Sequence, residues 1–179
     1  MYIWGMVVRK RLKLHGHALV FVTTTAHEWT PICREEKPAS LITRQLKESL
    51  EFYNVSLVGY VLMPSHLHML LGLKKVELLS KFMQSFKILS SKLIKEAAPS
   101  MTTIQLSEKG RFRLWRPRFD DLIITSEEQF RIKLNYIHYN PVKAGLAENP
   151  EDWKYSSACN WILGIPGLLP IEKDFAYTG

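Results

Sequence analysis

The sequence predicts an α+β fold in which an antiparallel sheet carries two helices on one face. Some segments are rich in β-branched and aromatic residues, as strands are, and others repeat apolar residues at helical spacing. Along the chain they follow the order strand, helix, two strands joined by a tight turn, helix, strand and helix. Two successive strand–helix–strand units form the ferredoxin-like arrangement, and the last helix is left to cover the remaining sheet surface.

The first strand and the first helix are expected within residues 18–53. Residues 18–25 (ALVFVTTT) are apolar or β-branched throughout, which is typical of a central strand. A loop containing Pro31 follows. From Ser40 to about Phe52, apolar residues recur at helical spacing and predict a helix.

A hairpin is expected next. Residues 56–63 and 66–73 predict two strands, and only Pro64 and Ser65 lie between them. A connection this short makes the two strands antiparallel neighbours.

The second strand of this hairpin carries two histidines, His66 and His68. Side chains alternate between the two faces of a strand, so the three apolar residues Leu67, Met69 and Leu71 share one face. The two histidines therefore stand together on the opposite face.

The remaining elements are a long helix, a strand and a final helix. The long helix ends near Ala97, and its expected buried stripe is Leu79, Phe82, Phe86, Leu89 and Leu93. An amphipathic edge strand is expected within residues 110–119. Ser126 and the two acids after it predict a helix start. That helix is expected to end near Asn140, because Pro141 disfavours helix before it, and to run through Phe130, Ile132, Leu134 and Ile137.

The chain of 179 residues suits one domain, with 46% hydrophobic and 23% charged residues. We expect a basic N-terminal arm over residues 1–17, the domain over residues 18–146, and a tail over residues 147–179 that packs on the domain. Cys33 and Cys159 are expected as free thiols. No apolar run reaches the length of a membrane span, so no membrane partner and a cytoplasmic location are expected.

The charge of the chain favours a polyanionic partner such as nucleic acid, since the net charge is +7 and the pI about 9.4. Basic and aromatic residues alternate within residues 110–119, where guanidiniums can pair with phosphates and rings can stack on unpaired bases. We expect this segment to serve both the core and DNA. The candidate DNA-contacting residues are Arg9, Lys10, Arg11, Lys81, Lys87, Arg111, Arg113, Trp115, Arg116, Arg118 and Lys143.

Four residues are candidates for chemistry. Neutral imidazoles such as those of His66 and His68 are common ligands of divalent metals, although such a pair also occurs as a half-exposed polar face. Tyr136 and Asn140 are four residues apart and share a helix face. A tyrosine hydroxyl can act as a nucleophile and an asparagine oxygen can bind a metal. Taken alone, Tyr136 would be interpreted as a packed aromatic residue.

Three sequence blocks together resemble the REP-associated tyrosine transposases, relatives of the single-tyrosine HUH transposases of small insertion sequences. They are residues 59–71 (GYVLMPSHLHMLL), 114–121 (LWRPRFDD) and 136–146 (YIHYNPVKAGL). The tail over residues 150–158 (PEDWKYSSA) is also similar, and the likeness covers roughly residues 16–161. The family usually has Asn where this chain has Ser65, a residue of similar turn propensity.

The resemblance implies a ferredoxin-like domain, completed by a C-terminal catalytic helix and tail, that cuts and rejoins single-stranded DNA at hairpin-forming repeats. It implies that Tyr136 is the nucleophile, with Tyr139 as the rival candidate, and that the products are a 5′-phosphotyrosine and a free 3′-hydroxyl. It also implies that His66, His68 and Asn140 hold Mg²⁺ or Mn²⁺.

Two other functions are compatible with the same residues. The first is a nucleic-acid hairpin-binding module that no longer cuts. The second is a metal-dependent phosphodiesterase that uses activated water and forms no covalent adduct. The resemblance further implies a bacterial protein, associated with the nucleoid when bound to DNA, and leaves a monomer and a homodimer open.

Overall fold

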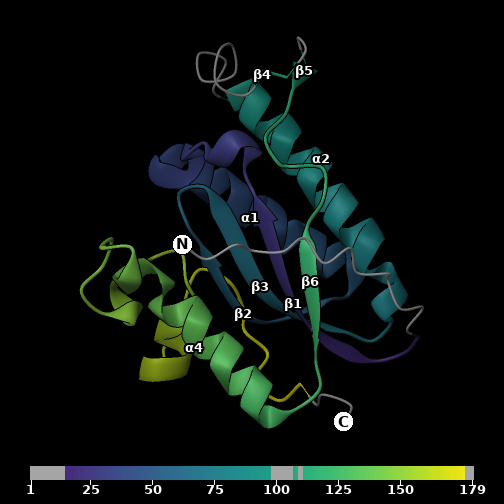
Figure 1. Ribbon diagram of the computed structural model, residues 1–179, viewed down its shortest axis with the longest axis vertical. Coiled ribbons are helices and arrows are strands. Elements are labelled where there is room, and N and C mark those ends of the chain that lie inside the picture. Colours follow the sequence, from purple (N-terminus) through teal and green to yellow (C-terminus); the bar gives the residue numbers. More distant parts are fainter. Residues whose placement is uncertain (1–14, 98–106, 109–110, 176–179) are drawn as a thin grey trace, which may run out of the picture.

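Four antiparallel strands form the central sheet of this computed structural model, which describes residues 15–97, 107–108 and 111–175 (Figure 1). Their order across the sheet is β2-β3-β1-β6. The strands are β1 (Ala18–Thr25), β2 (Ser56–Leu62), β3 (His66–Leu73) and β6 (Asp120–Ile124). A separate two-stranded ribbon joins β4 (Ser107–Glu108) to β5 (Arg111–Phe112).

Helices cover both faces of this sheet. In Figure 1, α1 lies on the far side of the sheet and α4 on the near side. The helices are α1 (Glu36–Tyr53), α2 (Leu79–Ala97) and α4 (Glu127–Lys143), with short turns of helix at His27–Trp29, Ile32–Arg34, Val76–Leu78, Pro150–Asp152 and Cys159–Leu163. The predicted arrangement, with two helices on one face and a further helix on the other, is confirmed.

Two apolar clusters lie on opposite faces of the sheet. The larger joins the sheet to α1 and α2 and contains fully buried Phe82 and Phe86. The smaller joins the sheet to α4 and contains Phe21, Leu134 and Ile137. Burial of apolar surface stabilises each layer by about 25 cal/mol per Å². Because side chains alternate along β3, one strand supplies both clusters.

The predicted strands over residues 18–25 and 66–73 match β1 and β3 at both ends, and β2 ends one residue before the predicted limit. A β-bulge lies between Leu57 and Gly59. A Cβ atom on Gly59 would come within 2.9 Å of the Leu134 side chain, so glycine lets α4 approach β2 closely.

The strand expected within residues 110–119 is confirmed only for Arg111–Phe112, which form β5 of the separate ribbon and do not join the central sheet. The strand that completes the sheet is β6, which begins at Asp120. Before it, Trp115 forms only an isolated bridge with Ala26, and Arg116 N–H donates to the Thr25 carbonyl. Pro117 lacks an N–H group, so the ladder along β1 is interrupted there and resumes at β6.

Two predicted helix boundaries, the start of α1 and the end of α4, are wrong. Helix α1 begins at Glu36 rather than Ser40, and Pro38 is tolerated because amide groups in the first turn have no intrahelical acceptor. Helix α4 begins after Ser126, whose side chain accepts from Gln129 N–H as expected, but it continues beyond Asn140 to Lys143. Pro141 removes a single helical hydrogen bond, and Ala144 N–H still donates to the Asn140 carbonyl at 3.0 Å.

One residue of the expected buried stripe of α2, and one apolar residue of α4, are exposed. Leu89 on α2 is 41% exposed and Ile132 on α4 is 56% exposed. On α2 the buried positions are Leu79, Phe82, Met83, Phe86, Ser90 and Ile94, so the stripe drifts around the helix with its period of 3.6 residues. In the part of the chain that the structure describes, no helix combines the length and apolar character of a membrane span.

The C-terminal segment covers the outer edge of β2. Leu62 N–H donates to the Tyr155 carbonyl, Ser157 N–H to the Tyr60 carbonyl, and Glu172 N–H to the Leu57 carbonyl. Trp153 and Trp161 add indole N–H bonds to carbonyls of the same strand. Backbone groups of an edge strand that would otherwise be open are thereby paired.

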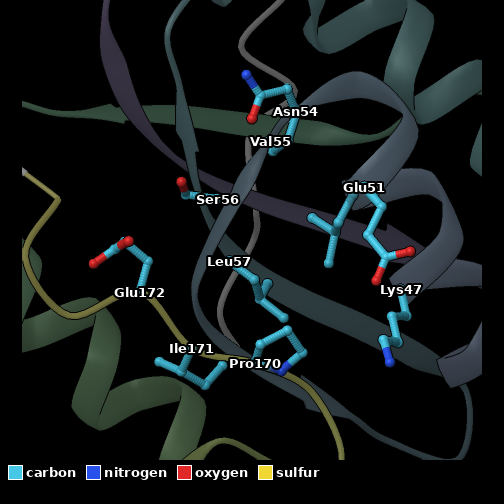
Figure 2. Close-up of a pocket in the computed structure, with 10 residues that line it drawn as sticks. Lys47, Glu51, Asn54, Val55, Ser56, Leu57, Pro170, Ile171 and Glu172 are labelled. Atoms are coloured by element: carbon cyan, nitrogen blue, oxygen red, sulfur yellow. The ribbon is translucent and has the colours of Figure 1, made fainter.

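The same segment borders a pocket of about 270 Å³ at the turn between α1 and β2 (Figure 2). Pro170, Ile171 and Glu172 line one side, and residues 54–57 with Lys47 and Glu51 line the other. None of the candidate chemical residues is among those that line it.

Ser157 joins the tail, β2 and α4. Its hydroxyl accepts from Tyr60 N–H at 2.9 Å and lies 2.9 Å from Nε2 of buried His138. We expect Ser157→Ala to lower the free energy of unfolding by about 1–3 kcal/mol, because both buried groups lose this partner. Urea denaturation measures the change. Ser85→Ala, on the opposite helix layer, is the matched control and should change stability by less than about 0.5 kcal/mol. Equal values for both variants would contradict this role of Ser157.

Candidate active site

His66 and His68 lie side by side on β3, on the face covered by α4, as the alternation of the strand predicts. Their ring centroids are 4.8 Å apart. His68 is 4% exposed, whereas His66 is half-buried near the end of the sheet. The pairing of β3 with β1 sets His68 opposite Thr23 and His66 opposite Thr25. The register of the sheet therefore fixes the positions of both histidines relative to β1.

Each histidine uses one ring nitrogen in a bond to a hydroxyl group. Nδ1 of His68 lies 2.8 Å from Thr23 Oγ1, and Nδ1 of His66 lies 3.2 Å from Ser65 Oγ. The ring of Phe21 stacks on His68 with centroids 5.6 Å apart and an interplanar angle of 17°. Both hydroxyl bonds use Nδ1 and not Nε2, which is the arrangement of a metal-binding histidine whose other nitrogen is held by a neighbour.

Burial favours the neutral form of both rings. It lowers the pKa of His66, and it lowers the pKa of His68 to about 3, with the charges of His66 and Lys133 contributing to the second shift. Neutral imidazoles have a free lone pair at neutral pH, which is the form that binds a metal.

Tyr136 of α4 reaches this histidine pair. Its hydroxyl lies 3.5 Å from Nε2 of His68, and the two ring centroids are 5.1 Å apart in an edge-on arrangement. Leu134 and Ile137 pack α4 against the sheet. Tyr136 lies next to these buried residues on the helix, at the border of the contact between α4 and the sheet. The side chain stays 40% exposed and accessible from solvent. Tyr139 is 48% exposed, and the contacts to His68 come from Tyr136.

Asn140 follows one helical turn after Tyr136 and is half-buried on the same helix face. Within the described part of the chain, no hydrogen bond joins its amide to either histidine. Its assignment as a third metal ligand stays a prediction.

Several residues of the site were not predicted from the sequence. Thr23 and Phe21 come from β1, and the Lys133 Nζ lies 4.8 Å from the Phe21 ring centroid and 5.8 Å from that of Tyr136. Lys133 precedes Tyr136 by three residues, so helical spacing could have indicated it. Trp29 places its ring 5.7 Å from that of His66, and no local pattern marks it.

Trp115 does not have the position expected of a base-stacking residue. Its side chain is 3% exposed, its indole N–H donates to Ser90 Oγ at 2.9 Å, and its ring lies against Phe86. A ring buried in this way offers no free face to a nucleotide. The alternation of basic and aromatic residues misled this assignment, because Leu114 and Trp115 enter the core together.

The sequence comparison with protein families identifies the chain. Residues 13–140 match the family described as Transposase IS200 like, which is more than half of the chain. The chain belongs to the IS200-like transposases.

Two curated bacterial proteins are similar to this IS200-like transposase. A Haemophilus influenzae protein assigned as a REP-associated tyrosine transposase is 26% identical over 114 residues, 62% of this chain and 63% of that protein. The REP-associated tyrosine transposase of Escherichia coli K12 is 33% identical over 63 residues, 35% of this chain and 37% of that protein. The chain thus spans less than two thirds of either relative. The resemblance predicted from the sequence is confirmed.

Two solved structures share the fold of this IS200-like transposase. One is a REP-associated tyrosine transposase bound to a REP hairpin, with a TM-score of 0.69 at 19% identity over 97% of this chain and 98% of that one. The other is a Deinococcus radiodurans R1 protein assigned as a transposase, with a TM-score of 0.52 at 19% identity over 72% of this chain and 95% of that one. The predicted α+β fold is confirmed.

The basic residues predicted to contact DNA have different environments in this IS200-like transposase. Arg116, Arg118 and Lys143 are exposed, and Arg113 is half-buried. Lys81 is exposed on α2, in the helix layer behind the sheet and away from the histidines. Arg9, Lys10, Arg11 and the side chain of Arg111 lie outside the described residues.

Lys87 stabilises the loop over residues 116–118 by hydrogen bonds to its carbonyl groups. Its ammonium donates to the Arg116 carbonyl and, at 3.2 Å each, to those of Pro117 and Arg118. Burial, followed by the charge of Arg113, lowers the pKa of Lys87 to about 8. An ammonium held by three carbonyls is not free to pair with a phosphate, so the predicted DNA contact gives way to a structural one.

We expect Lys87→Met to lower the free energy of unfolding by about 1 kcal/mol, because three carbonyls lose a charged donor that is partly screened by solvent. Hydrogen exchange at the Arg116 amide should also become faster, since the loop is released. Lys81→Met removes an exposed ammonium from the same helix and is the matched control. Unchanged exchange in Lys87→Met would show that the loop is held by other contacts.

Proposed function

We propose that this transposase is a metal-dependent single-stranded DNA endonuclease and strand transferase that acts at hairpin-forming repeats through a 5′-phosphotyrosine intermediate. The observation that carries this proposal is the approach of the Tyr136 hydroxyl to His68. A partly exposed phenol beside a rigid pair of neutral imidazoles combines a nucleophile with ligands for a divalent ion.

In the proposed reaction, Tyr136 Oη attacks the phosphorus atom of the scissile phosphodiester and loses its proton. A bond forms between phosphorus and Tyr136 Oη, and the bond from phosphorus to the 3′-oxygen of the preceding nucleotide breaks. That oxygen takes up a proton and leaves as a free 3′-hydroxyl. Attack by the same or another 3′-hydroxyl on the phosphotyrosine reverses the step and joins strands. One ester replaces another, so the exchange needs no external energy source.

The donors at the site fit Mg²⁺ or Mn²⁺. His66 and His68 are neutral, lie side by side, and keep Nε2 free of the hydroxyl bonds made by Nδ1. The described residues contain no cluster of three His, Cys, Asp or Glu side chains, so Asn140, a phosphate oxygen or water would complete the ligand set. Bound there, the ion would supply Lewis-acid polarisation of the scissile phosphate.

The residues around the site have further proposed tasks. Thr23 and Phe21 hold the His68 ring in place, and Lys133 puts a positive charge beside the Tyr136 ring, where a negative phosphate would lie. Arg116, Arg118 and Lys143 would contact the DNA backbone. The related structure bound to a REP hairpin and the net charge of +7 support hairpin DNA as the partner.

We expect Tyr136→Phe to abolish the covalent protein–DNA adduct, because the attacking oxygen is removed while the ring is kept. Wild-type protein is incubated with Mn²⁺ and a labelled hairpin with single-stranded flanks from the repeats around its gene, and a denaturing gel separates the adduct. Tyr139→Phe, the matched control, should form adduct at the wild-type level.

The same gel, together with a native gel that measures binding, separates the other functions. Cleavage without an adduct in the wild type would indicate a water-using phosphodiesterase. Binding without cleavage or adduct would indicate a hairpin-binding module that no longer cuts. Adduct formation by Tyr136→Phe would remove Tyr136 as the nucleophile.

We expect His66→Ala to lose Mn²⁺ binding and cleavage while hairpin binding stays near the wild-type level, because the proposed DNA contacts of Arg116, Arg118 and Lys143 are kept. Titration calorimetry measures the metal, and chelation of the wild type with EDTA should reproduce the loss of cleavage. His15→Ala changes an exposed histidine outside the pair and should bind Mn²⁺ normally. Loss of hairpin binding in His66→Ala would point instead to a structural role.

A further inference from the structure

Trp29 exposes a large aromatic ring next to the histidine pair. The side chain is 53% exposed, and its ring lies 5.7 Å from that of His66 in an edge-on arrangement. Phe21, which stacks on His68, is only 9% exposed by comparison. An exposed indole has a broad apolar face, and exposure of that face to water is unfavourable unless a ligand covers it.

The backbone around Trp29 is held in an unusual conformation. Glu28 and Trp29 have φ angles of 51° and 57°, in the left-handed region that residues other than glycine avoid. Hydrogen bonds hold the turn: Trp29 N–H donates to Ala26 at 3.1 Å, and Thr30 bonds the His27 carbonyl through both its N–H and its hydroxyl. Residues kept in such regions by their surroundings cluster at binding sites.

This turn is fixed to the site strand. Ala26 N–H donates to the Ser65 carbonyl at 2.8 Å, directly before His66, and His27 N–H donates to the Leu114 carbonyl at 2.8 Å. The position of the indole relative to the histidines is therefore set by backbone bonds on two sides. A rigid aromatic surface loses little conformational entropy when it binds a ligand.

Arg116 adds positive charge to the indole. Its guanidinium lies 5.3 Å from the ring centroid of Trp29, and the backbone N–H of Arg116 donates to the Thr25 carbonyl at 2.9 Å. Lys87 holds the loop that carries it. A flat apolar ring with a guanidinium over it matches the two parts of an unpaired nucleotide, since the base stacks on the ring and the phosphate pairs with the cation.

We propose that Trp29 and Arg116 form a stacking subsite for the unpaired base of a nucleotide next to the scissile phosphate. The inference rests on the proposed action on single-stranded DNA. Stacking positions the strand over the histidine pair and accepts any base, because every base has a π face.

The test measures DNA affinity in EDTA, where no cleavage interferes. The probes are one DNA hairpin with single-stranded flanks on both sides and a set of copies in which each flanking base in turn is removed to leave an abasic sugar. Trp29→Ala should weaken binding of the intact probe about tenfold, the effect of one lost base–aromatic stack. Trp29→Phe should restore most of the affinity. Phe52→Ala removes another exposed ring, 82% exposed on α1, and should bind as the wild type does.

The deciding result is the dependence on one base. An abasic sugar at the stacked position should weaken the wild type about as much as Trp29→Ala does, and should not weaken Trp29→Ala further. Unchanged affinity in Trp29→Ala would overturn the subsite. So would a result in which, at every flanking position, the abasic sugar weakens Trp29→Ala as much as it weakens the wild type.

The adduct assay with Mn²⁺ separates this inference from the proposed function. Adduct formation in the wild type without base-dependent binding through Trp29 would overturn the subsite alone. Base-dependent binding through Trp29 without any adduct would overturn the tyrosine mechanism and keep the subsite.

Discussion

The antiparallel pairing of β1 with β3 is the constraint on which the rest of the structure depends. Its register sets Thr23 beside His68, and its continuation past β1 ties the turn that carries Trp29 to the residue before His66. A slip of one residue would turn both histidines toward α1 and α2. The apolar residues of β3 that pack under those helices oppose such a slip, so the packing of one face determines the chemistry of the other.

Local sequence patterns predicted the two central strands and one helix start correctly. β1 and β3 were predicted to the residue because they are continuous apolar or alternating runs, and Ser126 was recognised as a helix cap. The boundaries that depend on neighbours were missed. The end of α4 was placed too early, because the helix continues through Pro141, which is buried and packed by its neighbours. The last strand was placed too early in the sequence, because Pro117 interrupts the pairing with β1.

Some residues of the candidate site were predicted from the sequence, and others are brought to it only by the fold. His66 and His68 were placed together by strand alternation, and the family resemblance pointed to Tyr136, whose hydroxyl does lie near them. Thr23 and Lys133 join them only through the register of β1 and the docking of α4. Trp115 and Trp29 show the limit most clearly: composition favoured the tryptophan in a basic run, whereas the folded chain buries that ring and exposes the other.

The C-terminal segment that pairs along β2 has a consequence for the whole molecule. It occupies hydrogen-bonding groups at the β2 edge of the sheet, where another copy could otherwise add a strand side by side. A chain shortened before Tyr155 would present a bare, apolar β2 at its margin. Such a fragment would be open to strand addition between copies, even with every residue of the histidine site intact.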